Sequence, residues 1–396
     1  MKKILSLVIA SNIFCFAVTA QTLSKSDMVK FDFAILAQKK KKVQAKNAAL
    51  MPAYNELIKN CNQLLLLKPA SVMDKADTPP SGSKHDYMSI APYWWPDTTK
   101  PGGVPYMRMD GHVTPETKNY ADKTNLPNLF ENVNLLALGY YFSNDEKYAK
   151  KATELLQVWF LDTATRMNPN MNFGQAVKGR SVGRAEALID SRGLIYLLDG
   201  VKLISKSASW TPEKNGGLQK WVADFLTWMR TNKLGIEELN AGNNHGIWYD
   251  AQELSYSLYL NDKPAAEKVI ARSLNRLKAQ MNADGVFPLE MERETSFHYS
   301  VFILNAFQII AQLSDEMQVD YWNKDLGGKS LKNAYDNILP FVKKEKPWVG
   351  KQIKPFTFGN AFPLLLLSYE KYGCRDCMEF IIKSEPDARK LVIQLL

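Results

Sequence analysis

The chain has 396 residues, of which 46% are hydrophobic and 11% aromatic, so it holds ample material for a large buried core. After the N-terminal segment no run of about 18 consecutive apolar residues occurs, which excludes a membrane-spanning helix in the rest of the chain. The formal net charge of +9 favours an anionic partner, although charge alone does not distinguish an acidic polysaccharide from nucleic acid or a membrane surface.

Residues 1–20 are predicted to be a cleavable signal peptide. Two lysines precede an apolar run that ends in the small residues Thr19-Ala20. The run is too short to span a bilayer comfortably and has the layout of an export signal. We therefore expect residues 21–396 to form the mature protein, in the periplasm or secreted.

Most of the remaining chain has the spacing of amphipathic helices, and little of it alternates as strands do. Between Gly217 and Thr231 the apolar residues form one helical stripe. Asp262 is a predicted N-cap, with Pro264 in the first turn that follows. The other predicted helices cover residues 28–46, 48–66, 128–142, 148–159, 184–205, 243–260, 262–277, 296–314, 330–343 and 357–371.

About a dozen helices in succession, joined mostly by short turns, predict antiparallel helical hairpins. The alternative is an open solenoid, but the sequence has no repeat of fixed period. We therefore predict an all-α fold in which residues 21–396 form a single α/α toroid of about six to seven hairpins.

Residues 71–118 do not fit the helical pattern, because they hold many prolines and several glycines. Their aromatic residues are Tyr87, Tyr93, Trp94, Trp95 and Tyr106. A structureless loop this long is usually functional or disordered, and its aromatic density argues against disorder. We expect an ordered excursion that lies over the mouth of the ring.

Cys374 and Cys377 form a closely spaced pair near the C-terminus. The pair would be half a zinc site, but no second pair and no histidine cluster lies near it in the sequence. A tight disulfide and two ordinary thiols near a helix start both fit the spacing. We assign no metal.

Three clusters carry side chains suited to chemistry. In residues 83–97, aromatic faces would stack on sugar rings and Lys84 and His85 would meet carboxylates; the alternative is a loop pinned by its own aromatics. Asn243-Asn244-His245 is either a functional group or a helix cap beside a surface histidine.

The third cluster is residues 290–299, where Arg293 and Tyr299 lie six positions apart, about two helical turns. The alternative is an exposed charged entry to a helix, with Tyr299 packed against Phe302 and Ile303.

At these residues the chain resembles the alginate lyase superfamily with the α/α toroid fold, in particular polysaccharide lyase family 38, which is related to family 5. The resemblance spans roughly residues 80–310. It is carried by Lys84-His85-Asp86-Tyr87, Pro92-Tyr93-Trp94-Trp95-Pro96, Gly183-Arg184, Ile189-Asp190-Ser191-Arg192-Gly193-Leu194, Asn243-Asn244-His245 and Arg293 to Tyr299. The chain departs from family 5 in overall length and in an insert around residues 98–118.

The resemblance implies an enzyme that cleaves 1,4-linked uronate polymers by β-elimination, with no metal and no other cofactor, and leaves 4,5-unsaturated products. Alginate with polymannuronate-type blocks is the expected substrate. Family 38 also contains enzymes that act on glucuronan, so glucuronan is the alternative polymer. Members of that family suggest a ring of seven hairpins.

The resemblance also implies roles for four catalytic residues. Asn244 and Arg293 would neutralise the substrate carboxylate, and His245 would assist them or act as the base. Tyr299 would act as general base and then general acid, which needs a phenol pKa well below its usual value of about 10. The expected substrate-binding residues are Lys84, His85, Tyr87, Tyr93, Trp94, Trp95, Gln175, Arg184, Tyr249 and His298.

Two other functions fit parts of the pattern. A glycoside hydrolase would need two carboxylates across the bond, with candidates Asp86, Asp97, Glu290, Glu292 and Glu294. A non-catalytic polyuronate-binding protein would use the same aromatic and basic residues. No motif supports nucleic-acid binding, and we expect a monomer or a homodimer.

Overall fold

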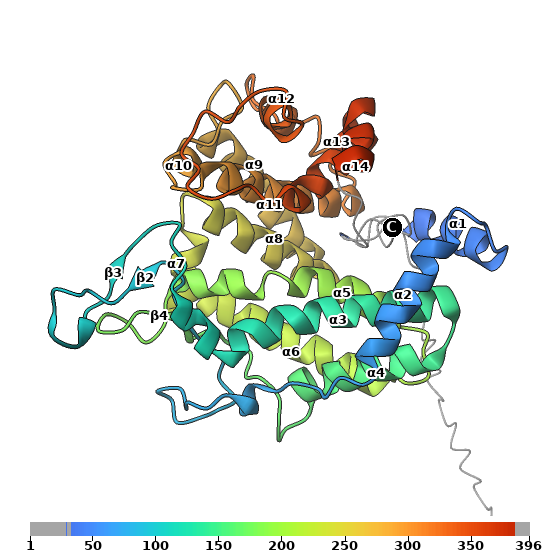
Figure 1. The fold of residues 1–396 in the computed structure, drawn as a ribbon, viewed down its shortest axis with the longest axis horizontal. Helices are drawn as coiled ribbons and strands as arrows, with labels where there is room; N and C mark the ends of the chain where they lie inside the picture. Colours follow the sequence, from blue (N-terminus) through green and yellow to red (C-terminus); the bar gives the residue numbers. More distant parts are fainter. Residues whose placement is uncertain (1–28, 30–32, 385–396) are drawn as a thin grey trace, which may run out of the picture.

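The computed structural model describes residue 29 and residues 33–384, so the predicted signal peptide lies outside the described residues. The fold is mostly helical, as predicted, and is of the α/α toroid type (Figure 1). The α-helices are α1 (Phe33–Gln44), α2 (Met51–Leu64), α3 (Ala121–Ser143), α4 (Glu146–Leu156), α5 (Leu194–Leu203), α6 (Pro212–Thr231), α7 (Lys233–Leu239), α8 (Asn244–Tyr259), α9 (Lys263–Gln280), α10 (Pro288–Met291), α11 (Ser296–Glu316), α12 (Leu331–Val342), α13 (Phe362–Tyr372) and α14 (Arg375–Ser384).

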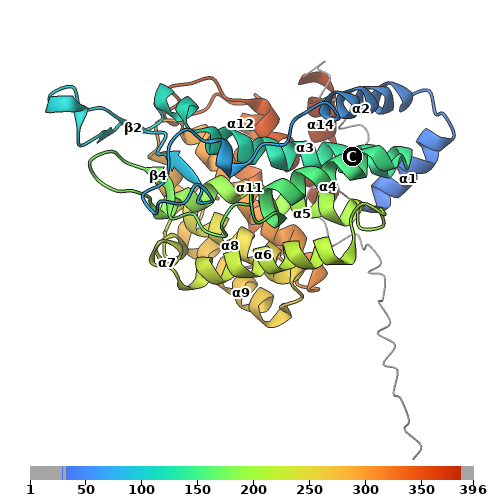
Figure 2. The ribbon, with the colours of Figure 1, turned by 90° about the horizontal axis from the view of Figure 1, so that it is seen from below.

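Neighbouring helices pack in pairs along the chain. α3 packs against α4 and α5, α8 against α9 and α11, and α13 against α14 (Figures 1 and 2). α8 and α11 are the most central, because nearly every residue from Asn244 to Leu258 is buried and so is most of α11. The first turns of both helices therefore stand on a rigid core. Among the described residues, none of the helices has the length and apolar content needed to cross a membrane.

Local signals explain most helix starts. The side chain of Asp262 accepts a hydrogen bond from the backbone N–H of Ala265, and Pro264 lies in the first turn, as predicted for α9. The single helix predicted for residues 184–205 is wrong. It is divided into a 3-10 segment, Ala185–Ser191, and α5, and at the junction a Cβ on Gly193 would lie 2.3 Å from the Phe130 ring.

The aromatic segment is ordered by short strands. β1 (Met88–Ile90) pairs in parallel with β4 (Phe173–Ala176), and β2 (Trp94–Trp95) pairs antiparallel with β3 (Met107–Arg108). The β2–β3 hairpin projects beyond the helices on the side where β4 and α7 lie (Figure 1). Sequence periodicity did not indicate these strands, because they are too short to show an alternating pattern.

A buried ion network ties α8 to α9. The fully buried carboxylate of Asp250 lies 2.7 Å from Nη2 of Arg272 and 2.8 Å from Nε of Arg276. Arg272 also contacts Glu253, at 2.5 Å. Because each charge depends on its partners for solvation, removing one member leaves the others buried and unpaired.

Replacing Asp250 by alanine is therefore expected to lower the free energy of unfolding by about 3–5 kcal/mol. Asp224, which forms an exposed pair with Lys220 on α6, provides the matched control. Its replacement by alanine should cost less than about 1 kcal/mol. Denaturant unfolding of the two variants checks this, and equal losses would contradict the structural role of the network.

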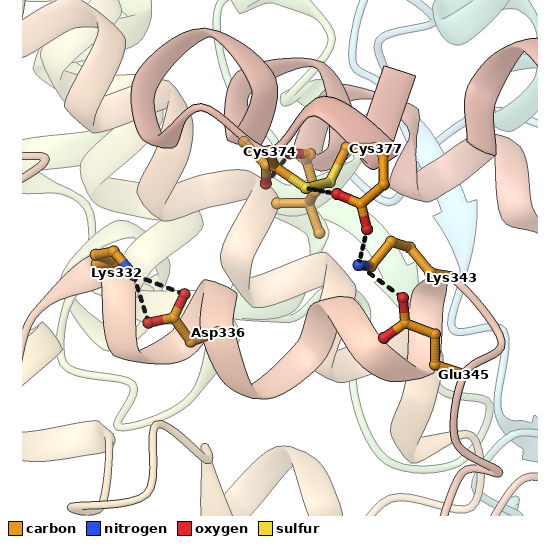
Figure 3. Close-up of a disulfide and its surroundings, with 9 residues drawn as sticks. Lys332, Asp336, Lys343, Glu345, Cys374 and Cys377 are labelled. Carbon is orange, nitrogen blue, oxygen red and sulfur yellow. Dashed lines mark hydrogen bonds and ion pairs between the residues drawn. A yellow bond between two sulfur atoms is a disulfide. The ribbon is translucent and has the colours of Figure 1, made fainter. Parts of the chain in front are cut away.

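Cys374 and Cys377 form a disulfide at the start of α14 (Figure 3). This decides between the two alternatives left open by the sequence. Nearby, Lys343 contacts both Glu345 and Asp376, and so ties the end of α12 to α14 (Figure 3). Within the described part of the chain, the cysteine pair with Asp376 forms the one group of three or more closely spaced potential metal ligands. Its thiols are consumed by the disulfide.

Candidate active site

A cavity of about 900 Å³ opens beside the β2–β3 hairpin, at the N-terminal ends of α8 and α11. Its walls come from segments far apart in the sequence, including the hairpin, the residues around β4 and α5, and the segment near Lys354. The basic side chains that line it are Arg108, Lys123, Arg184, Arg192, Arg293 and Lys354. They outnumber the four carboxylates of the lining, Glu186, Asp190, Glu237 and Glu238, so the cavity favours an anionic ligand.

Tyr299 and Arg293 meet at this wall. Nη2 of Arg293 donates a hydrogen bond of 2.7 Å to the Tyr299 hydroxyl, and the guanidinium carbon lies 3.6 Å from the centre of the Tyr299 ring. The Tyr299 hydroxyl in turn donates to the hydroxyl of Tyr93, at 3.1 Å. Arg293 precedes α11 and Tyr299 lies in its first turn, so the buried body of this helix fixes the pair.

Asp110 also holds Arg293. Nε lies 3.0 Å from Oδ2 and Nη2 lies 2.5 Å from Oδ1, which is a two-point fork. The backbone N–H of Glu294 donates to the same carboxylate, at 3.1 Å. Partial burial raises the pKa of Asp110, but these hydrogen bonds outweigh it and lower the pKa to about 2. Asp110 is therefore a permanent anion at neutral pH.

The Tyr299 pKa differs from the sequence expectation. Burial raises this pKa well above its ordinary value, Tyr93 and Asp110 raise it further, and Arg293 lowers it by too little to compensate. The expectation of a phenol pKa well below about 10 is therefore not met. The physical reason is that burial of the Tyr299 hydroxyl outweighs the neighbouring Arg293 cation, and Tyr93 and Asp110 oppose this cation as well.

His245 lies at the start of α8 and lines the same cavity. Its Nδ1 lies 2.7 Å from Oε1 of the buried Glu238, and its backbone N–H donates to the side chain of Asn243. A carboxylate at Nδ1 favours a proton on that nitrogen. The other ring nitrogen, Nε2, is then an acceptor, or a second donor when the ring is protonated.

Asn244 lies in the wall beside His245 but is fully buried. Its backbone N–H and its Nδ2 both donate to the carboxylate of Glu290, at 2.7–3.0 Å. Burial raises the pKa of Glu290, although the hydrogen bonds from Asn244 oppose this. Oδ1 of Asn244 has no hydrogen-bond partner among the described residues.

Five of the predicted substrate-binding residues line the cavity: Tyr93, Trp94, Gln175, Arg184 and His298. Two guanidiniums lie near the Trp94 ring, with the guanidinium carbons of Arg180 and Arg184 at 5.3 Å and 5.5 Å from its centre. The Gln175 amide is engaged inside the wall, because its Nε2 donates to the Asp190 carboxylate, at 3.1 Å. The ring of His298 is held by Gln352, at 2.7 Å.

The other five predicted residues do not line the cavity. Tyr87 and Tyr249 are fully buried, with hydroxyls that donate to Asp190 and to the backbone of Met229, so the expectation that they bind substrate is corrected. Both are apolar rings that fill the core while the hydroxyl finds a partner.

Lys84, His85 and Trp95 are engaged elsewhere. The Lys84 amine donates to the carbonyl of Lys75, the His85 ring contacts the carbonyl of Arg166, and the Trp95 indole donates to the carbonyl of His112. These contacts hold the aromatic segment in place, so for these three residues the structure fits the alternative of a pinned loop, while Tyr93 and Trp94 of the same cluster line the cavity.

Three site residues were missed by the sequence analysis: Asp110, Glu238 and Glu290. Each is a carboxylate that holds one of the four expected catalytic residues. Asp110 lies 183 positions from Arg293 in the chain, so no local spacing signals the contact. Glu290 was considered only as a possible hydrolase acid, and its closeness to Arg293 in the sequence was the one available signal.

The model of the family described as alginate lyase matches residues 71–348 of the chain. The protein belongs to the alginate lyase family. An alginate lyase from Bacteroides ovatus, known from a crystal structure, has 35% sequence identity to this chain and a TM-score of 0.87. The match covers 93% of this chain and 98% of the Bacteroides ovatus chain. No curated protein sequence matches the chain significantly.

More distant structures share the fold alone. Alginate lyase A1-III from Sphingomonas species A1 is 15% identical, with 91% of this chain and 93% of its own covered and a TM-score of 0.57. A variant of alginate lyase A1-III in complex with a tetrasaccharide is also 15% identical, with 90% and 91% covered and a TM-score of 0.58. The family and the fold together establish a polysaccharide lyase.

Proposed function

We propose that this lyase is exported, acts on alginate, and prefers its polymannuronate-type blocks. Tyr299 acts as the general base and then the general acid, and Arg293, Asn244 and His245 neutralise the substrate carboxylate. Assignment to polysaccharide lyase family 38 rather than family 5 is part of this proposal, as is a monomeric or homodimeric state.

The observation that carries the proposal is the contact between Arg293 and Tyr299 inside a basic cavity. β-Elimination needs a cation at the carboxylate, to stabilise charge that develops on it, and a base that reaches C5. The Arg293 guanidinium is such a cation and the Tyr299 hydroxyl is such a base, and the two are joined by a hydrogen bond of 2.7 Å. In mannuronate the C5 proton and the C4 oxygen lie on one face of the sugar, so one phenol can serve both steps.

The reaction then proceeds in two steps. Tyr299 reacts as its phenolate, a minor form that arises when the hydroxyl proton passes to solvent, because the pKa of Tyr299 is raised. With the carboxylate neutralised, this phenolate takes the C5 proton and the charge moves onto the carboxylate as an enolate. The electron pair returns to form the C4–C5 double bond, the bond from C4 to the glycosidic oxygen breaks, and the phenol proton passes to that oxygen. Nε2 of His245 stands as a second donor at the carboxylate when the ring is protonated.

Asn244 fits its proposed role less directly than Arg293 does. Its Nδ2 donates to Glu290, so the atom that would meet a substrate carboxylate is engaged in the structure without substrate. It therefore contributes as a donor only if the amide turns, and Arg293 is the main neutralising group in this proposal.

Glucuronan is the alternative polymer, because in glucuronate, too, the C5 proton and the C4 oxygen lie on the same face of the sugar. The two other classes of function are less well supported. None of the five carboxylates proposed for a hydrolase, Asp86, Asp97, Glu290, Glu292 and Glu294, lines the cavity. A purely binding protein would have no need for a base held against an arginine.

The test is a panel of polymannuronate, polyguluronate, glucuronan and hyaluronan, followed by the ultraviolet absorbance of the unsaturated product. Polymannuronate should give the fastest rise, and a chelator should leave the rate unchanged. Cleavage without any absorbance would indicate hydrolysis, and a faster rise with glucuronan would replace the proposed substrate.

A further inference from the structure

We propose that Asp110 is a positioning residue that fixes the guanidinium of Arg293 against Tyr299 and balances its charge. The inference rests on the proposed function, since it concerns the same cavity, and it deepens the proposal by naming what orients the base and its cation. Asp110 was not among the residues expected from the resemblance.

The fork from Arg293 to Asp110 leaves the guanidinium only one orientation. Nε and Nη2 are both committed to the carboxylate, and Nη2 also reaches the Tyr299 hydroxyl. Among the described residues Nη1 has no hydrogen-bond partner, so this nitrogen is the one left for a substrate carboxylate. A bidentate pair of this kind specifies direction as well as charge.

The same hairpin carries both contacts to the pair. The backbone N–H of Met109 donates to the carbonyl of Tyr93, at 2.7 Å, so Asp110 and Tyr93 move together. Tyr93 touches the Tyr299 hydroxyl, and Asp110 touches Arg293. The residues at the two ends of the β2–β3 hairpin therefore contact both Tyr299, the proposed base, and Arg293, its neighbouring cation.

The glycine that follows Asp110 permits this approach. Gly111 has a φ of +72°, which side chains rarely adopt, and a Cβ there would lie 2.9 Å from the Ile353 side chain and 3.2 Å from that of Glu294. The backbone at Asp110 is thus pressed against the segment that precedes α11. Such close packing indicates that the carboxylate is seated on Arg293 rather than swinging in solvent.

Charge balance gives the inference a signature in the pH profile. The charged and titratable groups that face Asp110 are Arg293, Arg108 and Lys351, and those that face Tyr299 are Tyr93, Arg293 and Asp110. The Asp110 anion raises the pKa of Tyr299. Removing this anion while keeping its shape therefore lowers the pKa of the base.

The experiment compares Asp110→Asn with the wild type and with Asp110→Glu, by kcat and kcat/KM on polymannuronate between pH 6 and pH 10. Asp110→Asn should lower kcat by up to about 10²-fold, because an Asn amide cannot accept from both Nε and Nη2 and the guanidinium is displaced. The rising limb of its pH profile should move toward acid pH, because the anion that raises the pKa of Tyr299 is gone. Asp110→Glu restores the charge and should return the limb toward the wild-type position. A profile that superimposes on that of the wild type overturns the charge-balancing claim.

Two controls complete the design. Asp97→Asn removes a partly exposed carboxylate from the same segment of residues 71–118, outside the cavity, and should leave the profile unchanged. A crystal structure of Asp110→Ala tests the geometry without any activity: the guanidinium should leave the Tyr299 ring, and an unmoved guanidinium overturns the positioning claim. If the wild type itself forms no unsaturated product, the proposed function fails while the crystal structure still decides the role of Asp110.

Discussion

Replacing Tyr299 by phenylalanine is expected to lower kcat on polymannuronate by about 10²–10⁴-fold, the usual contribution of general acid–base catalysis. The substitution removes only the hydroxyl that receives the Arg293 hydrogen bond and faces Tyr93. The ring still fills its place in the first turn of α11, so the stability of the fold and the binding of oligomannuronate should change little. Initial rates of product absorbance and calorimetric binding to an oligomannuronate check both parts.

Tyr369→Phe is the matched control, because Tyr369 is an exposed tyrosine on α13, outside the cavity. It should retain wild-type turnover. A Tyr299→Phe variant with wild-type turnover would remove Tyr299 from its proposed role. A variant that loses binding together with turnover would instead indicate that the hydroxyl serves mainly to bind substrate.

Replacing Arg293 by glutamine should be nearly as severe, with kcat lower by about 10²–10³-fold, as when one donor to a developing oxyanion is removed. Two effects add. The substrate carboxylate loses its main cation, and Asp110 stays charged beside Tyr299, so the pKa of the base rises further. Steady-state kinetics at several pH values measure the loss, which should be larger at neutral than at alkaline pH.

Arg375→Gln, at the start of α14, is the control for the loss of one positive charge from the protein. It should keep wild-type kinetics. If Arg293→Gln raised KM and left kcat unchanged, Arg293 would bind the ground state and the transition state equally, and its proposed role in stabilising the enolate would be wrong.

Helical periodicity predicted the α/α toroid type because amphipathic stripes and helix caps depend on residues close together in the sequence, as α6 and α9 show. It failed between residues 184 and 205, where a 3-10 segment precedes α5 and the Phe130 ring packs so closely against Gly193 that no side chain would fit there. The short helix α7 was missed, since seven residues give too few turns for a stripe.

The candidate site was predictable to the extent that its groups lie close together in the chain. Arg293 and Tyr299 are six positions apart, so the start of α11 brings them together. The carboxylate that holds Arg293 comes from elsewhere in the chain, and Asp110 reaches it because the β2–β3 hairpin lines the cavity beside the start of α11. Tyr87 and Tyr249 were predicted to bind substrate because they lie near motif residues in the sequence, but their side chains are buried in the core.

The central claim is that the Tyr299 hydroxyl faces the C5 proton of a mannuronate whose carboxylate is held by Arg293. A crystal structure of Tyr299→Phe with a bound oligomannuronate tests it most directly. We predict that the carboxylate at the cleavage position meets Nη1 of Arg293 and that C5 turns its proton toward the ring of residue 299. A carboxylate bound away from Arg293, or a C5 proton on the opposite face of the sugar, would contradict the account.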